Sequence, residues 1–354
     1  MSDSVLSDYP RYHELAYSHG SAPLAAGDFK TLPEDFVVEE VLGFELSGEG
    51  EHLWLWVEAR DMTTDFMVRH LAAAFELEKK QISFSGKKDR RAVTRQWFSL
   101  HVPGRYPARG EIPLPVLAHP DIKILQAELH HKKLRRGTHQ QNRFTIRMRQ
   151  LSGDLDQLSE RVASIRGSGF PNYFGLQRFG RQENNIDEAC GALTVSRRLK
   201  RQARDRIYST LRAWDFNRQL SLRVASGTWQ QYLAGDTLQL SGSRSLFQPD
   251  AWDETLQDRL DKADIQVAGI LPGKGERRLP LPYGWYEPDP RLLEFLVKQR
   301  VEQGTRPLGV RPTDWQCEWL ENDLMLAFAL PAGAFATGLL RELIQLRETG
   351  TAEP

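Results

Sequence analysis

The 354-residue sequence predicts an α+β fold in which a helical segment is inserted into a strand-rich domain. Three observations support this prediction. Short segments rich in β-branched and aromatic residues fill the first part of the chain, helical periodicity dominates the middle, and strand patterns return after residue 312. Strand-rich ends around a helical middle are typical of a domain inserted into another domain.

The first part of the chain alternates predicted strands with one helix. Strands are expected at 36–40, 52–59, 82–84 and 93–102. Thr63 or Thr64 can cap a helix that begins there, because a side-chain oxygen satisfies the first backbone N–H groups. A tight basic loop, 86–91, joins the third and fourth strands, whereas the first twenty residues lack periodicity and are expected to wrap the surface.

The clearest strand covers 143–149. One face of it carries Phe144, Ile146 and Met148, and the other carries Arg143, Thr145, Arg147 and Arg149. The apolar face is therefore expected to pack on a core. The opposite face offers three guanidinium groups.

The middle and end of the chain are punctuated by two breaks. The breaks lie at 167–169 and 309–312. Between them we expect helices at 186–193 and 200–222 and a strand at 237–240. After them we expect strands at 317–320 and 324–330 and a helix at 334–346.

Several classes of protein do not fit the sequence. Cys190 and Cys317 form no C-x-x-C pair, which argues against a disulfide framework and a cysteine-based zinc site. No phosphate-binding glycine loop, H-E-x-x-H or G-x-S-x-G motif occurs, so we expect no nucleoside triphosphate and no metal. Because neither a signal peptide nor an apolar run of about 20 residues is present, we expect the cytoplasm.

Charge is balanced overall but unevenly distributed. The 47 basic residues offset the 47 acidic ones, yet 130–150 contains seven Lys or Arg residues and no acid. Two other basic runs lie at 87–95 and 197–206. A single run is usually a solvated face, but three runs favour a positive surface that binds phosphates.

Asp89 lies within the basic loop, between Lys88 and Arg90. One interpretation is a turn residue that hydrogen-bonds its own backbone. The alternative is a nucleophile that must stay ionised in a partly dry pocket, where adjacent cations favour the carboxylate and attract the phosphodiester chain. The aromatic segment 172–180, which includes Arg178, is similarly ambiguous, because it can stack bases or pack a domain junction.

Five segments follow one another along the chain: 32–39 (LPEDFVVE), 85–94 (SGKKDRRAVT), 137–144 ending in Asn142-Arg143-Phe144, 171–180 (PNYFGLQRFG), and 331–337 (PAGAFAT) followed by Arg341-Glu342-Leu343. Together they resemble the motifs of the TruD family of tRNA pseudouridine synthases. The similarity covers nearly the whole chain, and the segment from about 182 to 305 matches loosely. Five co-linear motifs favour the catalytic interpretation of the basic loop.

The resemblance implies a role for each of these residues. Asp89 is the expected nucleophile, Phe36, Asn142 and Phe335 are expected to line the uridine pocket, and Lys30 and Lys88 to supply charge near the carboxylate. RNA contacts are expected from Arg90, Arg91, Arg143, Arg147, Arg149 and Arg178. The implied fold is a pseudouridine-synthase domain, 1–167 and 313–354, with a mixed, largely antiparallel sheet flanked by helices, and an inserted α+β TRUD domain, 168–312.

The implied reaction converts uridine 13 of transfer RNA to pseudouridine. The C1′–N1 bond breaks, the base turns, and a C1′–C5 bond forms, so no cofactor is needed. Attack by Asp89 at C6 of uracil and assistance at C1′ both remain open. Two alternatives also remain: a pseudouridine synthase acting on another RNA, and a non-catalytic RNA-binding protein. We expect a monomer.

Overall fold

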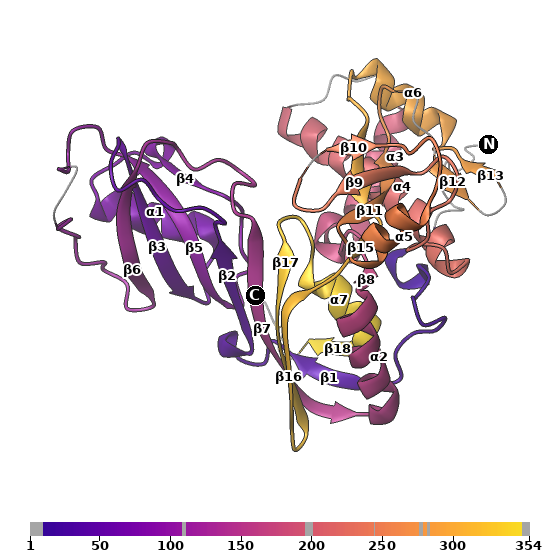
Figure 1. Ribbon diagram of the computed structural model, residues 1–354. Coiled ribbons are helices and arrows are strands. Elements are labelled where there is room, and N and C mark those ends of the chain that lie inside the picture. The colour runs from indigo at the N-terminus through magenta and orange to yellow at the C-terminus, as the bar shows by residue number, and fades with distance from the viewer. Residues whose placement is uncertain are drawn as a thin grey trace. The chain divides into compact units, whose positions relative to one another are not determined.

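The computed structural model describes residues 10–107, 111–194, 201–243, 245–275, 279–281 and 284–348 (Figure 1). Their contacts form two compact units. We call the first the sheet unit; it consists of 24–156, 312–333 and the segment from 344 onward. The second, the middle unit, contains 157–311 together with 334–343 and the N-terminal segment up to 23.

The sheet unit is built on a ten-stranded sheet with the central order β16-β17-β7-β2-β5-β3-β6. Its strands are β1 (Ala26–Phe29), β2 (Phe36–Val41), β3 (His52–Arg60), β4 (Ile82–Phe84), β5 (Val93–His101), β6 (Ile122–His130), β7 (Gln141–Ser152), β16 (Thr313–Leu320), β17 (Asp323–Pro331) and β18 (Gln345–Glu348). Only β2–β5 and β1–β18 pair in parallel among the described pairs of this sheet. The predicted mixed, largely antiparallel sheet is therefore confirmed.

Helix α1 (Thr64–Ala74) packs on this sheet through its apolar face. Thr63 caps it, since its hydroxyl oxygen accepts the backbone N–H of Phe66. Met67 and Leu71 are fully buried in a core that includes Leu55 of β3. Two short 3-10 helices, Pro33–Asp35 and Lys79–Gln81, lead into strands β2 and β4.

Strand β7 shows why the alternation at 143–149 was informative. Phe144, Ile146 and Met148 are all buried, and Phe144 lies opposite Val38 of β2 and Phe328 of β17. Because β7 pairs with β2 on one side and β17 on the other, it is an interior strand, and its three apolar side chains are buried on one face of the sheet. The strand fixes the position of Asn142 near its beginning.

The middle unit combines helices with a four-stranded antiparallel sheet of order β10-β9-β11-β14. Its helices are α2 (Leu155–Ser168), α3 (Asn184–Thr194), α4 (Arg201–Ala225), α5 (Glu254–Asp261), α6 (Pro290–Lys298) and α7 (Ala336–Leu343). Its strands are β8 (Phe170–Pro171), β9 (Thr237–Leu240), β10 (Leu246–Phe247), β11 (Ile265–Leu271), β12 (Leu279–Leu281), β13 (Gly284–Tyr286), β14 (Gly304–Pro307) and β15 (Gly309–Val310). Three 3-10 helices complete it: Tyr12–Glu14, Leu176–Arg178 and Arg181–Glu183. Phe216 and Leu220 of α4 pack with Val267 of β11 in its core.

Two sequence predictions need correction here. The helix expected at 334–346 ends at Leu343, because Gln345 donates its N–H to Ala25 and begins β18. Pairing with β1 thus overrides the helical periodicity. The N-terminal segment is also more than a surface wrap, since Leu15 is buried in the core of the middle unit. Among the described helices, none is both long and apolar enough to cross a membrane.

Candidate active site

Asp89 lies on the loop between β4 and β5 of the sheet unit. Its side chain is 43% exposed, and its Oδ2 atom is 3.7 Å from Nζ of Lys30, which is only 15% exposed. The lysine ammonium also lies 4.2 Å from the Phe36 ring centroid and 5.1 Å from that of Phe29. Two aromatic rings and a carboxylate therefore hold one cation beside the candidate nucleophile.

The backbone at Lys30 is in the left-handed region, with a φ of 55°. A side chain there costs on the order of 1 kcal/mol, and such conformations concentrate at functional sites. Here the conformation accompanies the contact between Lys30 and Asp89. A glycine would adopt this backbone more readily but could not supply the ammonium.

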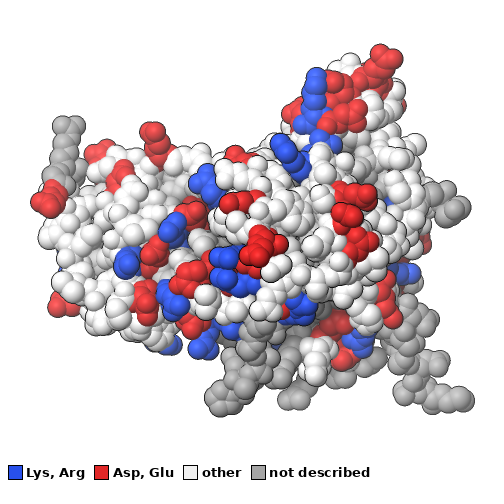
Figure 2. Space-filling view, turned by 90° about the horizontal axis from the view of Figure 1, so that it is seen from below, with Lys and Arg blue, Asp and Glu red and all other residues white. Residues whose placement is uncertain are grey.

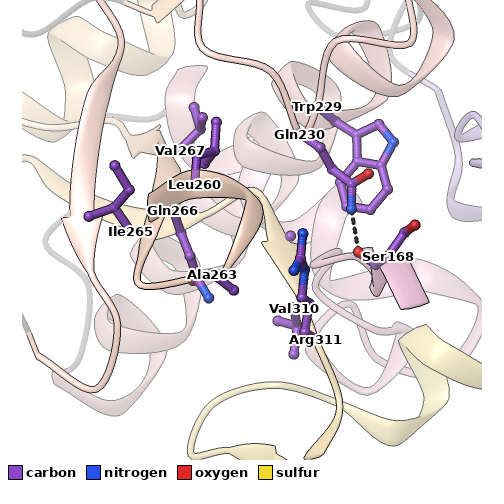
Figure 3. A pocket seen from close by; sticks show the side chains of 11 residues that line it. Ser168, Trp229, Gln230, Leu260, Ala263, Ile265, Gln266, Val267, Val310 and Arg311 are labelled. Carbon is purple, nitrogen blue, oxygen red and sulfur yellow. Dashed lines mark hydrogen bonds between the residues drawn. The ribbon is translucent and has the colours of Figure 1, made fainter. Parts of the chain in front are cut away.

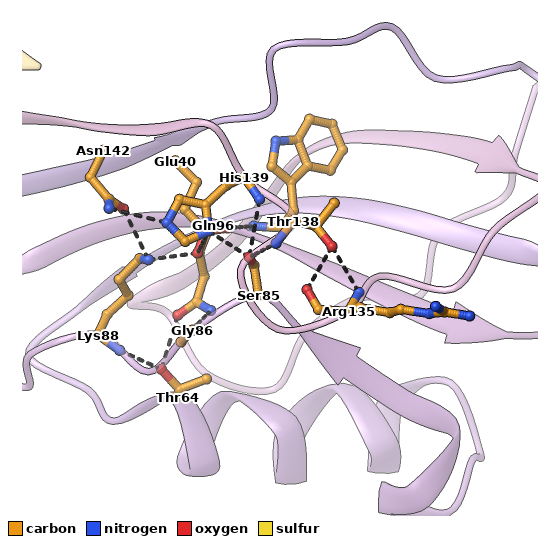
Figure 4. A network of polar contacts seen from close by, with 11 residues as sticks. Glu40, Thr64, Ser85, Gly86, Lys88, Gln96, Arg135, Thr138, His139 and Asn142 are labelled. Atoms are coloured by element: carbon orange, nitrogen blue, oxygen red, sulfur yellow. Dashed lines mark hydrogen bonds and ion pairs between the residues drawn. The ribbon is translucent and has the colours of Figure 1, made fainter. Parts of the chain in front are cut away.

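Behind Asp89, the loop is anchored by a buried ion pair (Figure 4). Nζ of Lys88 is 2.6 Å from Oε1 of Glu40, and both side chains are nearly inaccessible, at 7% and 0% exposed. The backbone N–H of Lys88 donates to Oγ1 of Thr64, and that hydroxyl donates to Gln96. The residue next to Asp89 is thus fixed through its side chain and its backbone.

The same network has a defined hydrogen-bond direction. An ammonium can only donate, so Nζ of Lys88 donates to Oδ1 of Asn142, 3.1 Å away. The Asn142 amide then donates through Nδ2 to Nε2 of His139, at 3.1 Å. A neutral His139 that accepts at Nε2 carries its proton on Nδ1, which lies beside Oγ of Ser85. Burial lowers the pKa of His139; the Glu40 carboxylate raises this pKa and the Lys88 ammonium lowers it further. The net lowering favours the neutral imidazole.

Known proteins resemble the chain over nearly its full length. The family model of tRNA pseudouridine synthase D (TruD) matches residues 15–208 and 197–343. A tRNA pseudouridine synthase D of Hydrogenovibrio crunogenus is 37% identical, over 94% of this chain and 96% of the relative. That of Chromohalobacter salexigens is 40% identical, over 93% and 95%.

The chain belongs to the TruD family. It is therefore a member of an enzyme family, the pseudouridine synthases, which are isomerases. A crystal structure from Methanosarcina mazei that carries the TruD designation shares the fold, with a TM-score of 0.63 at 19% identity, covering 93% of this chain and 95% of that one. The expected pseudouridine-synthase fold class is confirmed.

The TruD resemblance also implies pocket roles for Phe36, Asn142 and Phe335. These three residues have different surroundings in the structure. Phe36 is 2% exposed and packs edge-on against Phe29, so its ring supports Lys30 from within the core. Asn142 lies in the polar network described above. Phe335 belongs to the middle unit, where its ring centroid is 6.4 Å from that of Phe174.

Lys88 is the second lysine expected near the carboxylate. Its ammonium pairs with Glu40 and Asn142, whereas that of Lys30 lies 3.7 Å from Asp89; the charge-supplying role implied for Lys88 stays a prediction. Sequence reasoning missed Glu40, His139, Ser85 and Thr64. Glu40 and Ser85 lie inside or beside motif segments, but only the fold shows that they meet.

The arginines of β7 are engaged with carboxylates. Arg143 pairs with Asp314, Arg147 with Asp323, and Arg149 forms a two-pronged contact with Asp35. On the loop, Arg90 lies 3.8 Å from Asp61. In the middle unit, Arg178 donates to the Ser209 hydroxyl. On the face shown in Figure 2, basic and acidic side chains are interspersed rather than gathered into one positive patch.

A small pocket in the middle unit does not suit a nucleotide. It is lined by Trp229, Val267 and Arg311 among others, and Gln230 closes one side by donating to the Ser168 carbonyl (Figure 3). Its volume of about 40 Å³ holds only a few water molecules. Among the described residues, no group of three or more His, Cys, Asp or Glu side chains could hold a metal ion.

Proposed function

We propose that this chain converts uridine 13 of transfer RNA to pseudouridine, with Asp89 as the nucleophile. Membership of the TruD family and the names of its relatives support the reaction class. The geometry of Asp89 supports its role, because its accessible carboxylate faces Lys30. The preceding residue of the loop, Lys88, is held in place by its ion pair with Glu40. A turn residue needs neither the ammonium nor the anchor.

The reaction balances without a cofactor. The C1′–N1 bond of uridine breaks, the uracil turns while bound, and C1′ joins C5. The proton of C5 leaves to solvent and N1 gains one, so the product is an isomer of the substrate. The target base must leave its stack to reach Asp89, as in other base-modifying enzymes. The Lys30 ammonium, 3.7 Å from Asp89, offsets part of the cost of desolvating its negative charge.

We assign roles in uridine binding to Lys30, Phe36 and Asn142 of the sheet unit and, separately, to Phe335 of the middle unit. An amide offers two donor hydrogens and two acceptor lone pairs. Lys88 takes one acceptor position of Asn142, and His139 takes one donor hydrogen. The amide thus retains a donor and an acceptor, the pair that the Watson–Crick edge of uracil requires. Lys88 acts on the site by orienting this amide.

RNA contacts are assigned to two sets of arginines. The first set is Arg90, Arg91 and Arg178. The second is Arg143, Arg147 and Arg149, for which an RNA phosphate competes with Asp314, Asp323 and Asp35. We further propose a monomer that acts in the cytoplasm, with the catalytic domain at 1–167 and 313–354 and the TRUD domain at 168–312.

The decisive variant is Asp89→Asn, which keeps size but removes the nucleophile. We expect no detectable tritium release from C5-labelled tRNA, while filter binding to the same tRNA is retained because phosphate contacts supply most of the affinity. The matched control is Asp65→Asn, which removes another carboxylate paired to a lysine of the loop, Lys87. It should keep near-normal turnover.

Residual turnover by Asp89→Asn at a readily measurable fraction of the wild-type rate contradicts the nucleophile assignment. The substrate is tested separately, by mapping pseudouridines in small RNA from cells with and without the gene. Loss of pseudouridine at another position, with position 13 unchanged, contradicts the assignment of uridine 13.

A further inference from the structure

Two arginines of the middle unit lie against one phenylalanine ring. Cζ of Arg306 is 4.1 Å from the ring centroid of Phe174, and Cζ of Arg178 is 5.6 Å from it. Phe335 joins the cluster, 5.9 Å from Cζ of Arg306. Guanidinium groups bind aromatic faces by cation–π attraction. One apolar ring therefore holds two positive charges in the same place.

The arrangement favours an anion. Like charges held on one ring repel, and contact with the rings removes water that would screen them. Burial, and secondarily Arg178, lower the pKa of Arg306 to about 9, so its positive charge is retained at neutral pH in surroundings that oppose it. Two hydrogen bonds to Asn172, one to its carbonyl and one to its side-chain oxygen, fix the guanidinium orientation. A phosphate here offsets the repulsion without moving either arginine.

A pocket of about 380 Å³ opens beside this cluster and has room for more than a phosphate. Phe174 and Arg306 form part of its wall, and the remaining lining residues are Gln239, Leu271, Thr305 and Pro307. The volume falls in the range of small-molecule sites, and the mixture of apolar walls with a few polar groups is typical of them. An unstacked base can bind both aromatic rings and guanidinium planes.

We propose that this pocket binds one unstacked nucleotide of the RNA substrate, with its phosphate at Arg178 and Arg306 and its base against Phe174. The proposal rests on the RNA-modifying function above and adds a second nucleotide site to the one for the target uridine. Phe335 belongs to both assignments, because it contacts this cluster and is assigned to the uridine pocket.

The test compares two replacements of Arg306 in the Asp89→Asn background, where tRNA binds without turnover. Arg306→Met removes the charge, so the slope of log affinity against log salt should fall by about 0.7, the contribution of one single-stranded phosphate. Affinity should fall more than tenfold. Arg306→Lys should keep the slope but lose several-fold in affinity, since an ammonium has no planar face for stacking.

The matched control is Arg259→Met, at a half-exposed arginine of the same unit that pairs with Asp264, and it should leave slope and affinity unchanged. A wild-type slope in a folded Arg306→Met protein overturns the proposal. If that protein does not fold, Thr305→Phe fills the pocket instead. It should weaken tRNA binding about tenfold, and unchanged binding overturns the proposal.

Binding and turnover separate this proposal from the proposed function. A wild-type protein that forms no pseudouridine, but whose tRNA affinity still depends on Arg306, refutes the reaction and keeps the nucleotide site. Normal pseudouridine formation by Arg306→Met, with unchanged affinity for tRNA, refutes the nucleotide site and leaves the proposed reaction in place.

Discussion

Among the buried carboxylates of the two units, Glu40 of the sheet unit and Asp215 of the middle unit have contrasting partners. In the sheet unit, Glu40 accepts from Lys88 through Oε1 and from the backbone N–H of Trp97 through Oε2. In the middle unit, Asp215 of α4 accepts from the hydroxyl of Tyr286 and the amide of Gln219. One carboxylate has an ammonium partner, whereas the donors hydrogen-bonded to the other are neutral groups.

The difference shows what each carboxylate does. Glu40 holds a charged loop residue in place beside the candidate nucleophile. Asp215 connects helix α4 to β13, and Gln219 extends the connection to β11 by bonding both backbone groups of Ile270. With neutral partners, burial raises the pKa of Asp215 to about 6. The first carboxylate therefore organises a site, and the second joins elements of a core at some electrostatic cost.

The largest expected effect comes from removing Glu40. Glu40→Gln leaves the Lys88 ammonium buried without its counter-ion, and the free energy of unfolding should fall by about 3–5 kcal/mol. The control is Glu39→Gln, which removes a partly exposed carboxylate paired with Arg95 and should cost under about 1 kcal/mol. Urea unfolding measures both. Equal losses in the two variants contradict the distinction drawn for Glu40.

A titration should separate the two units, because their stabilities depend on pH with opposite sign. Asp215 has a folded pKa above its unfolded value of 3.8, so its contribution is greatest at acid pH and is lost, by about 3 kcal/mol, as the pH rises to about 6. His139 has a folded pKa below 6.5, so the sheet unit loses stability as the pH falls below 6.5. Protonation also turns Nε2 of His139 into a donor facing the Asn142 amide.

Hydrogen exchange, corrected for intrinsic rates, reports the two units separately. Between pH 7 and pH 5 we expect protection to fall around His139, in the loop before β7, and in the first residues of β7, and to rise in α4. His139→Gln should reduce the acid sensitivity of the sheet unit, to which His52 and His130, whose pKa values burial also lowers, contribute as well. A common slope in both units refutes the assignment of these two groups as the cause.

The smallest expected effect sharpens the description of Asp215. Tyr286→Phe removes one of its two hydrogen bonds and should destabilise the protein by about 1–3 kcal/mol at pH 8, where the carboxylate is ionised. At pH 5 the carboxyl is largely protonated, so the loss should be smaller. Thermal unfolding at the two pH values measures this difference, and a loss that is equal at both contradicts an ionised Asp215 at pH 8.

The sequence predicted where strands and helices of the sheet unit lie better than it predicted which strands pair with one another. Alternation around Phe144 located β7, and Thr63 located the start of α1, because both signals are local. Strands β1, β6, β11 and β14 were not predicted, and β18 was taken for the end of a helix. Pairing with distant strands decides these segments, and short-range periodicity carries no information about it.

The same limit applies to the candidate site. Motif similarity indicated Asp89, Lys30 and Asn142, but the contact between Lys88 and Glu40 joins residues 48 apart in the sequence. That between Asp215 and Tyr286 joins residues 71 apart. From the sequence alone, Glu40 would be expected to face solvent, as a charged residue in a strand usually does. Asp215 would be expected to do the same, as one of many charged residues in α4. Their burial follows from packing and is not encoded in neighbouring residues.

The path of the chain between the two units limits how the protein can be divided. The main chain passes between them at five places, near residues 23, 156, 311, 333 and 343. Leu339 and Leu340 of α7, fully buried, and Leu15 of the N-terminal segment are enclosed by the middle unit. Removal of 168–312 therefore strips the cover from apolar side chains at both ends of the remaining polypeptide. A ribosome must also finish almost the whole chain before either unit can close, so a late truncation exposes surface from both units to proteases.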